Sequence, residues 1–335
     1  MKLLPIMERS ISFLTNRSGP YFLSMDVTMR CNCRCKFCNV WTKLQSPQEM
    51  EIENSTLKIM EKRLEEAWQL GCRSVCFAGG EPTLYRNLGS LVSKASALGY
   101  YVEVITNGIN LTKPEPWMRK IDVPAISFTM DRETYEKTRG LPVFEVVKDN
   151  IEKAANFGIK VVLFDMLNKD TLPHVEETAE FACKLGIKLH IFSVTEQSRL
   201  GYETIDWNDQ RPENVYIEME RVKRKWGRNI ILWRGGEAML AGIGLYEGFR
   251  CRVAETTVVV KPDGSVVLPC AAFPKYRSEP EENLAEFWDS VNAVEARKYC
   301  GEFKFCEGCV LQFCNYCLSL LGQPHKALNW LFDCI

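Results

Sequence analysis

Two hydrophobic periods alternate between residues 21 and 195. Short apolar runs, typical of buried strands, are followed by longer stretches in which apolar residues recur every three or four positions, as on one face of a helix. Strands are predicted at residues 21–27, 74–78, 101–106, 125–130, 160–166 and 188–194. Helices are predicted at residues 56–70, 87–98, 143–157 and 174–185. Gly71, Gly99 and Gly158 follow three of these helices, as C-terminal stop signals.

These strands and helices form six βα-like units with apolar strands. Strands joined by helices imply right-handed crossovers and a parallel sheet. Six units are too few for an eight-stranded barrel. The pattern therefore predicts an α/β fold, an open partial (β/α)6 barrel, with its chemistry at the carboxyl ends of the strands.

The pattern changes after residue 195. Residues 213–226 are predicted to be helical within a connector at 196–249, and a hairpin is predicted where two apolar runs flank the turn at residues 262–264 (Pro-Asp-Gly). We therefore expect a partial barrel at 21–195 and a small Cys-rich α+β domain at 250–335. Residues 1–20 form an amphipathic segment, with apolar residues at helical spacing, expected to pack on the domain or, less favourably, to lie on a membrane surface.

Composition excludes several classes of protein. The 335 residues are 46% apolar and carry 42 basic and 43 acidic side chains, a net charge of −1. No run of one charge sign supports a nucleic-acid partner. No apolar run reaches the roughly 20 residues of a transmembrane helix. Pro5, Glu8 and Arg9 interrupt any secretory signal, so we expect a cytoplasmic location, with peripheral membrane contact as the alternative.

Fifteen cysteines are unusual for such a chain. Without an export signal, a disulfide framework is disfavoured and metal binding is favoured. Four cysteines lie between residues 31 and 38, and eight lie from residue 251 onward. This uneven distribution predicts two metal-bearing regions.

The first group follows a predicted strand and has the spacing C-x3-C-x2-C, formed by Cys31, Cys35 and Cys38. Three thiolates around a cubane cluster leave one iron open to a substrate or cofactor. Structural zinc is the alternative, but it needs four ligands and no histidine is near. Cys33 does not fit the spacing and is interpreted as a bystander thiol.

This loop resembles the signature of the radical S-adenosylmethionine (radical SAM) superfamily, in which an aromatic residue, here Phe37, commonly precedes the last cysteine. The resemblance implies that the open iron of a [4Fe-4S] cluster binds the methionine moiety of S-adenosylmethionine. The reduced cluster then cleaves the sulfonium and yields a 5′-deoxyadenosyl radical.

A second motif, Gly79-Gly80-Glu81-Pro82, follows the second predicted strand and resembles the family's GGEP motif, which binds the methionine ammonium. Glycines allow close backbone approach, and a glutamate can accept a hydrogen bond from an ammonium. The resemblance further implies that other residues contact the cofactor. These are Asn107 beside Gly108, Thr129 and Asp131 after the fourth strand, Arg139, and marginally Asn168.

The cysteines near the C-terminus resemble the SPASM extension of this superfamily. Two flank the predicted hairpin, a C-x2-C-x4-C-x2-C group follows, and one is distal; a zinc ribbon is the alternative. The resemblance implies two auxiliary iron–sulfur clusters. One would be held by Cys306, Cys309, Cys314 and Cys334, and the other by Cys251, Cys270 and Cys317. The fourth ligand of the latter stays open between Cys300, a non-cysteine group and a substrate.

The resemblance implies an enzyme that abstracts hydrogen from an unactivated carbon, in an oxygen-poor setting and with an external electron donor such as ferredoxin or flavodoxin. It assigns no catalytic residue. Many peptide maturases of this superfamily carry an N-terminal peptide-binding domain, and about 20 residues before the first strand are too few for one. We therefore expect a small-molecule, cofactor or lipid head-group substrate. Ala271 and Ala272 also stand where sulfatase-maturating relatives tend to have an acidic base. The alternatives are a peptide- or protein-modifying maturase, a non-catalytic electron-transfer protein and a zinc-stapled binding module.

Overall fold

One sheet of ten strands organises the computed structural model, which describes residues 19–36, 38, 40–42, 56–167, 170–193, 212–232 and 251–306. The strand order is β10-β9-β8-β1-β2-β3-β4-β5-β6-β7. The strands are β1 Phe22–Thr28, β2 Ser74–Gly79, β3 Tyr101–Thr106, β4 Val123–Ser127, β5 Val162–Leu167, β6 Lys188–Ser193, β7 Ile230–Leu232, β8 Thr257–Val260, β9 Val266–Leu268 and β10 Tyr276–Arg277.

The six predicted strands form the parallel centre of this sheet, which confirms the partial barrel. Strand β4 begins earlier than predicted because Val123 already pairs with Glu103, and it ends at Ser127. Strand β7 lies within the predicted connector and pairs in parallel with β6. The barrel is therefore extended beyond its six predicted units on this side.

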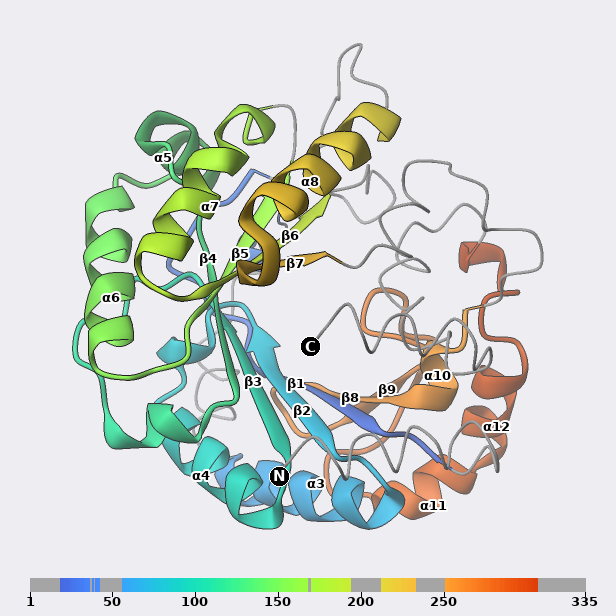
Figure 1. Cartoon of the computed structure of the whole chain (residues 1–335). Helices are drawn as coiled ribbons and strands as arrows, with labels where there is room; N and C mark the ends of the chain where they lie inside the picture. Colours follow the sequence, from blue (N-terminus) through green and yellow to red (C-terminus); the bar gives the residue numbers. More distant parts are fainter. Residues whose placement is uncertain are drawn as a thin grey trace.

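Helices surround the outside of the curved sheet (Figure 1). Those of the barrel are α3 Leu57–Leu70, α4 Leu88–Leu98, α5 Arg132–Arg139, α6 Phe144–Asn156, α7 Val175–Lys184 and α8 Pro212–Trp226. Those of the C-terminal region are α10 Val253–Thr256, α11 Leu284–Asp289 and α12 Val291–Lys298. The five helices predicted between residues 56 and 226 all form. Helices α5, α10, α11 and α12 are additional, and short 3₁₀ helices include η2 Pro82–Leu84 and η3 Pro116–Lys120.

The two faces of strand β1 differ, as the alternation of strand side chains requires. Leu23, Met25 and Val27 are fully buried, in one core with residues of α3 and α4. Ser24 and Asp26 face the opposite, inner side of the sheet and are half-buried. The helix layer thus supplies most of the hydrophobic core, and the inner face carries polar side chains.

The predicted hairpin joins this sheet directly. Strand β8 pairs in parallel with β1, and β9 pairs antiparallel with β8. Gly264 has a φ of +87° at the turn, and a Cβ there would lie 2.3 Å from Cγ2 of Ile59 on α3. The sheet therefore runs without a break from the barrel into the C-terminal region, although the division at residue 250 stays a prediction.

Arg63 of α3 attaches this hairpin to the barrel. Its side chain is fully buried, and its Nε donates to the carbonyl of Gly264 at 2.8 Å. Its Nη1 and Nη2 donate to the carbonyls of Glu282 at 2.7 Å and Pro280 at 2.8 Å, and Nη2 also reaches that of Glu279 at 3.3 Å. One guanidinium thus satisfies carbonyls from two separate loops.

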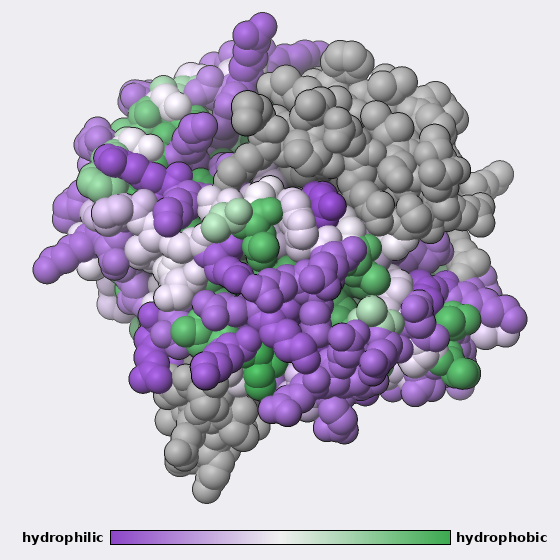
Figure 2. Space-filling view, turned by 90° about the horizontal axis from the view of Figure 1, so that it is seen from below, coloured by the Kyte–Doolittle hydropathy of each residue, from purple (hydrophilic) through white to green (hydrophobic). Residues whose placement is uncertain are grey.

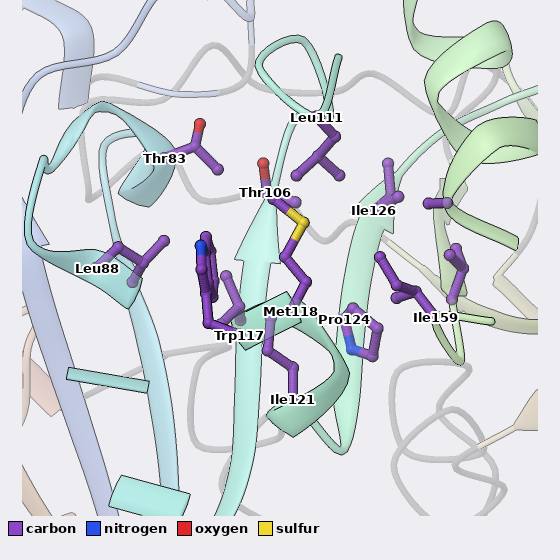
Figure 3. A pocket seen from close by; sticks show the side chains of 13 residues that line it. Thr83, Leu88, Thr106, Leu111, Trp117, Met118, Ile121, Pro124, Ile126 and Ile159 are labelled. Carbon is purple, nitrogen blue, oxygen red and sulfur yellow. The ribbon is translucent and has the colours of Figure 1, made fainter. Parts of the chain in front are cut away.

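A small apolar cavity lies on the helix side of the sheet, between β3, β4 and η3 (Figure 3). Its volume is ≈ 20 Å³, and its walls include Trp117, Met118 and Ile126. Such a volume holds at most about one water molecule, and an apolar lining leaves it dry. We interpret this cavity as a packing void of the core.

The outer helices have an ordinary polar surface. In α3, Lys58, Lys62 and Glu65 are exposed, and the described residues on the face seen from below are mainly hydrophilic, with scattered hydrophobic ones (Figure 2). Within the described ranges, no helix combines the length and apolarity that crossing a bilayer requires. The amphipathic segment at 1–20 lies almost entirely outside the described residues.

Candidate initiation site and cysteine clusters

The two predicted motifs and Asn107 meet at one edge of the sheet. The cysteine loop follows β1, the GGEP motif closes β2, and Asn107 follows β3. These three strands are parallel neighbours, so their carboxyl ends lie side by side. The structure thus brings together residues that are about 80 positions apart in the sequence.

The GGEP turn is packed tightly against the start of the cysteine loop. The N–H of Gly80 donates to the carbonyl of Thr28, and the N–H of Glu81 donates to that of Arg30, each at 2.7 Å. A Cβ on Gly80 would lie 2.1 Å from the oxygen of Arg30, and one on Gly79 would lie 2.2 Å from that of Thr28. Both glycines are therefore required by the close approach of the two backbones.

The carboxylate of Glu81 is occupied by donors of the protein itself. It is 1% exposed. Its Oε1 accepts from the hydroxyls of Thr83 at 2.5 Å and Thr106 at 2.6 Å, and its Oε2 accepts from the N–H of Asn107 at 2.7 Å. Burial raises its pKa, against these hydrogen bonds. Glu81 thus holds the GGEP turn to the end of β3, and its contact with an ammonium stays a prediction.

The end of helix α5 supports the other side of the cysteine loop. The N–H of Arg34 donates to the carbonyl of Arg139 at 2.9 Å, and that of Lys36 to the carbonyl of Thr138 at 3.1 Å. Gly140 has a φ of +71°, and a Cβ there would lie 2.8 Å from the oxygen of Arg34. The loop is also tied to β3, because Nδ2 of Asn107 donates to Oδ1 of Asn32 at 2.7 Å.

Arg139 places a buried positive charge beside the thiols. It is 8% exposed, and its Nη1 donates to Sγ of Cys35 at 3.6 Å. A hydrogen bond from Cys33 and the charge of Arg139 lower the pKa of Cys35 to about 6. The Cys33 hydrogen bond also lowers the pKa of Cys31, whereas burial raises that of Cys38.

The donor set fits an iron–sulfur cluster. Iron binds thiolates, and a buried guanidinium favours the thiolate form of Cys35. Cys33 is 1% exposed and hydrogen-bonds the side chains of both Cys31 and Cys35, so it lies inside the loop. Among the described residues, no three Cys, His, Asp or Glu side chains converge on a single metal ion. A cubane instead binds each thiolate through a different iron.

Thr129 and Asp131 make contacts within the protein. The hydroxyl of Thr129 donates to Oδ1 of the buried Asp165 at 2.6 Å. Oδ1 of Asp131 accepts from the N–H of Thr134 at 2.7 Å, which caps α5 and lowers the pKa of Asp131. Both lie beyond the end of β4, and their contacts with the cofactor stay predictions.

The hairpin cysteines lie at the opposite edge of the sheet. Cys251 precedes α10 and β8, and Cys270 follows β9, which runs antiparallel to β8. The start of β8 lies beside the start of β1, where the N–H of Tyr21 donates to the carbonyl of Thr256 at 3.0 Å. Cys306 ends the last described element. Phe37, Asn168, Cys309, Cys314, Cys317 and Cys334 lie outside the described residues.

The inner face of the sheet holds polar residues that sequence analysis did not identify. Ser24, Cys76 and Glu103 lie in register on three adjacent strands. Burial raises the pKa of Glu103 to about 7, against a hydrogen bond with Cys76. Nζ of Lys261 forms an ion pair with Oδ2 of Asp26 at 2.6 Å. The sequence feature that could have identified these residues is a polar side chain, within each predicted strand, at a position that faces the inner side of the sheet.

Comparisons with known proteins agree with this geometry. Residues 25–182 match the Radical SAM superfamily. The chain is 25% identical over 232 residues to the sporulation killing factor maturation protein SkfB of Bacillus subtilis, covering 65% of this chain and 54% of SkfB. It is 28% identical over 216 residues to a probable GTP 3′,8-cyclase of Saccharolobus islandicus, covering 61% of this chain and 66% of the cyclase. The chain thus spans about half to two thirds of the length of these relatives.

A solved structure shares the fold over a larger part of the chain than the family match covers. Streptococcus suis SuiB bound to S-adenosylmethionine superposes with a TM-score of 0.68 at 20% identity, over 89% of this chain and 72% of SuiB. SuiB has also been solved with its precursor peptide SuiA. The superposition extends well beyond the 158 residues of the family match, into the Cys-rich region.

Proposed function

Because the chain belongs to the radical SAM superfamily, we propose that it is an enzyme that modifies a peptide or protein by abstracting hydrogen from an unactivated carbon. When bound at Cys31, Cys35 and Cys38, a [4Fe-4S] cluster supplies the electron that cleaves S-adenosylmethionine to a 5′-deoxyadenosyl radical. The observation that carries this proposal is the contact of the cysteine loop with both the GGEP turn and α5.

Several residues of the chain hold the segments around the cysteine loop in position. Arg139 offsets the negative charge of the thiolate at Cys35. Glu81 fixes the GGEP turn against β3 through buried hydrogen bonds, so the backbone around the cofactor is preorganised. The inner face of the sheet offers Glu103 and the Asp26–Lys261 pair as polar groups for a substrate in the barrel.

A relative supports a peptide substrate over the small molecule or lipid head group that the sequence suggested. SkfB is named as a maturation protein, and its likeness covers 65% of this chain. The cyclase favours a second candidate, a nucleotide substrate, over a comparable 61% of the chain. For both substrate classes we propose auxiliary clusters in the Cys-rich region and an external electron donor, such as ferredoxin or flavodoxin.

The first experiment tests radical initiation. The full chain is reconstituted anaerobically with iron and sulfide, reduced with dithionite and given S-adenosylmethionine, and 5′-deoxyadenosine is quantified. We expect it from the wild type and from Cys183→Ala, a cysteine of helix α7 far from the loop in sequence. Cys35→Ala should form none. Equal formation by Cys35→Ala and the wild type would contradict the proposal.

The second experiment separates the two substrate classes. The reduced enzyme and S-adenosylmethionine are incubated in parallel with a small-peptide fraction of cell extract and with purified GTP. We expect mass changes in peptides that depend on enzyme and cofactor, and unchanged GTP. Conversion of GTP with no changed peptide would replace the peptide proposal by the nucleotide one.

A further inference from the structure

Glu103 carries a carboxylate into the interior of the barrel. It is the third residue of β3, between Val102 and Val104, which both lie in the core on the helix side of the sheet. Because the side chains of a strand alternate between its two faces, Glu103 points to the inner side, where it is half-buried. It therefore belongs to the wall of the barrel interior, where we place the substrate.

The residues directly beside Glu103 offer it no strong donor. Opposite it on β2 is Cys76, which is 5% exposed and whose thiol, a weak donor, hydrogen-bonds the carboxylate. Opposite it on β4 is Val123, which has no side-chain donor. Within the described ranges, no ion pair includes Glu103. Burial accordingly raises its pKa to about 7.

The other charges on the inner face are paired or distant. Asp26 of β1 and Lys261 after β8 form an ion pair with each other at 2.6 Å. His190 of β6 is uncharged at neutral pH, because burial lowers its pKa to about 4. Lys188 stands three strands away from β3, at the exposed start of β6. Among these described neighbours, none offsets the charge of Glu103.

A second buried glutamate shows what Glu103 lacks. A carboxylate inside a protein is costly unless it is paired or well hydrogen-bonded. Glu81 meets this requirement with the hydroxyls of Thr83 and Thr106 and the N–H of Asn107. Glu103 has only a thiol in its described surroundings. The missing partner is a strong donor or a cation, and a bound substrate can supply it.

The place of Glu103 along the strand suits a substrate of the initiation site. Glu103 is three residues before Thr106, the end of β3, so it lies about 10 Å below the edge that carries the cysteine loop. One step nearer this edge, the inward positions of β2 and β4 hold Ala78 and Ala125. Their short side chains do not screen the carboxylate from the edge. A group bound at Glu103 would extend the rest of its molecule toward the cysteine loop.

We propose that Glu103 binds a cationic nitrogen of the peptide substrate, an ammonium or a guanidinium. The bound cation fixes one end of a peptide segment and presents a carbon about 10 Å away to the radical. This inference rests on the proposed function, because the cation belongs to the peptide that the enzyme modifies. A lysine, an arginine and the N-terminal amine all have this chemistry, and the test distinguishes them.

The test uses a peptide that the wild type modifies, identified by its mass change and then synthesised. Three analogues each remove one kind of charge: lysine is replaced by norleucine, arginine is replaced by citrulline, or the N-terminal amine is acetylated. Their kcat and KM are measured with the full-length reconstituted wild type, Glu103→Gln, Glu103→Asp and the control Glu180→Gln. Glu180 is exposed on the outer helix α7, where it pairs with Lys184 at 2.6 Å.

We expect one analogue to lose about tenfold or more in kcat/KM with the wild type, mainly through KM, because a hydrogen-bonded ion pair is lost. Glu180→Gln should show the same loss. Glu103→Gln should show it already with the unchanged peptide, and removal of the cation should then add little, since the two groups are coupled. Glu103→Asp, which keeps the charge, should retain part of the difference. Circular dichroism and iron content confirm that each variant is folded and loaded.

Two results would overturn the inference. One is that none of the three analogues loses activity with the wild type, a comparison that needs no variant. The other is a folded Glu103→Gln variant that loses as much as the wild type when the cation is removed. In both cases the wild type still modifies its peptide, so the proposed function stands. A wild type that forms 5′-deoxyadenosine and modifies no peptide would instead contradict the proposed peptide substrate, and this inference with it.

Discussion

Replacement of Arg63 by methionine should weaken the attachment of the hairpin to helix α3 and destabilise the fold. The guanidinium is fully buried, and it donates to four backbone carbonyls of residues 264–282 and to Oε2 of Glu66 at 2.7 Å. Methionine is unbranched and has no donor, so the Arg63→Met variant removes these hydrogen bonds while its side chain still fills the space of the arginine stem.

The cost follows from the number of acceptors left without a donor. A hydrogen bond contributes about 1 kcal/mol net, and a buried acceptor without a partner costs about 1–3 kcal/mol. Loss of the four carbonyl contacts therefore predicts a destabilisation of about 4 kcal/mol, a large part of the 5–15 kcal/mol that is typical of folded proteins. The buried guanidinium has its own desolvation cost, which keeps the expected value near this lower bound.

Anaerobic urea unfolding, followed by circular dichroism, measures this loss. Lys62→Met is the matched control, since Lys62 is the preceding residue on α3 and its exposed Nζ donates to the carbonyl of Glu281 at 3.0 Å. We expect the control to change the free energy of unfolding by less than about 0.5 kcal/mol. Equal unfolding midpoints for the two variants would refute the role assigned to Arg63.

Two further predictions concern the initiation site and the core. Gly80→Ala should abolish binding of the initiation cluster, measured as a loss of about four irons per chain relative to the wild type, because its Cβ would lie 2.1 Å from the oxygen of Arg30. Gly158→Ala, whose Cβ meets nothing within 4 Å and which adds only the strain of a φ of +86° after helix α6, should keep its iron. Burial raises the pKa of Asp165 to about 7, so the folded chain retains a proton that the unfolded chain releases above about pH 4. Stability in urea should therefore fall as pH rises from about 4 to about 7, and Asp165→Asn should reduce this slope, whereas the exposed Asp149→Asn should leave it unchanged.

The convergence of the two motifs could be predicted from sequence because it follows from topology. Once the strands are taken as parallel neighbours, the segments after β1 and β2 must meet at one edge. The hairpin could be predicted because a Pro-Asp-Gly turn between apolar runs is a local signal. Both predictions required only short-range patterns and one rule for connecting strands.

Helix α5 was missed because hydrophobic periodicity hardly marks it. Its eight residues, RETYEKTR, include one apolar side chain, Tyr135, and it is stabilised at its start by the Asp131 cap. The useful signals were Asp131, a residue that commonly caps the start of a helix, and Gly140, a residue that commonly ends one. This matters for the site, since α5 positions Arg139 beside Cys35.

Arg63 could not have been identified from local sequence. An arginine on an amphipathic helix ordinarily reaches solvent, and the carbonyls that bury this one come from residues about 200 positions later. The occupied carboxylate of Glu81 is a similar case, because Thr106 and Asn107 belong to the next strand and its loop. Hydrogen bonds to residues far away in the sequence leave no trace in the hydrophobic periodicity of a segment, so these contacts could not be predicted from it.

Strand β1 links the two cysteine regions mechanically. The initiation loop leaves its carboxyl end, whereas Cys251 and Cys270 lie toward its amino end, beside the start of β8. Seven residues at about 3.3 Å each make a spacer of about 20 Å. Because β1 is hydrogen-bonded along both edges, to β2 and β8, this spacer is stiff. The separation between the two regions is thus set by the covalent length of one strand, and any rearrangement that admits a substrate must take place in the loops around it.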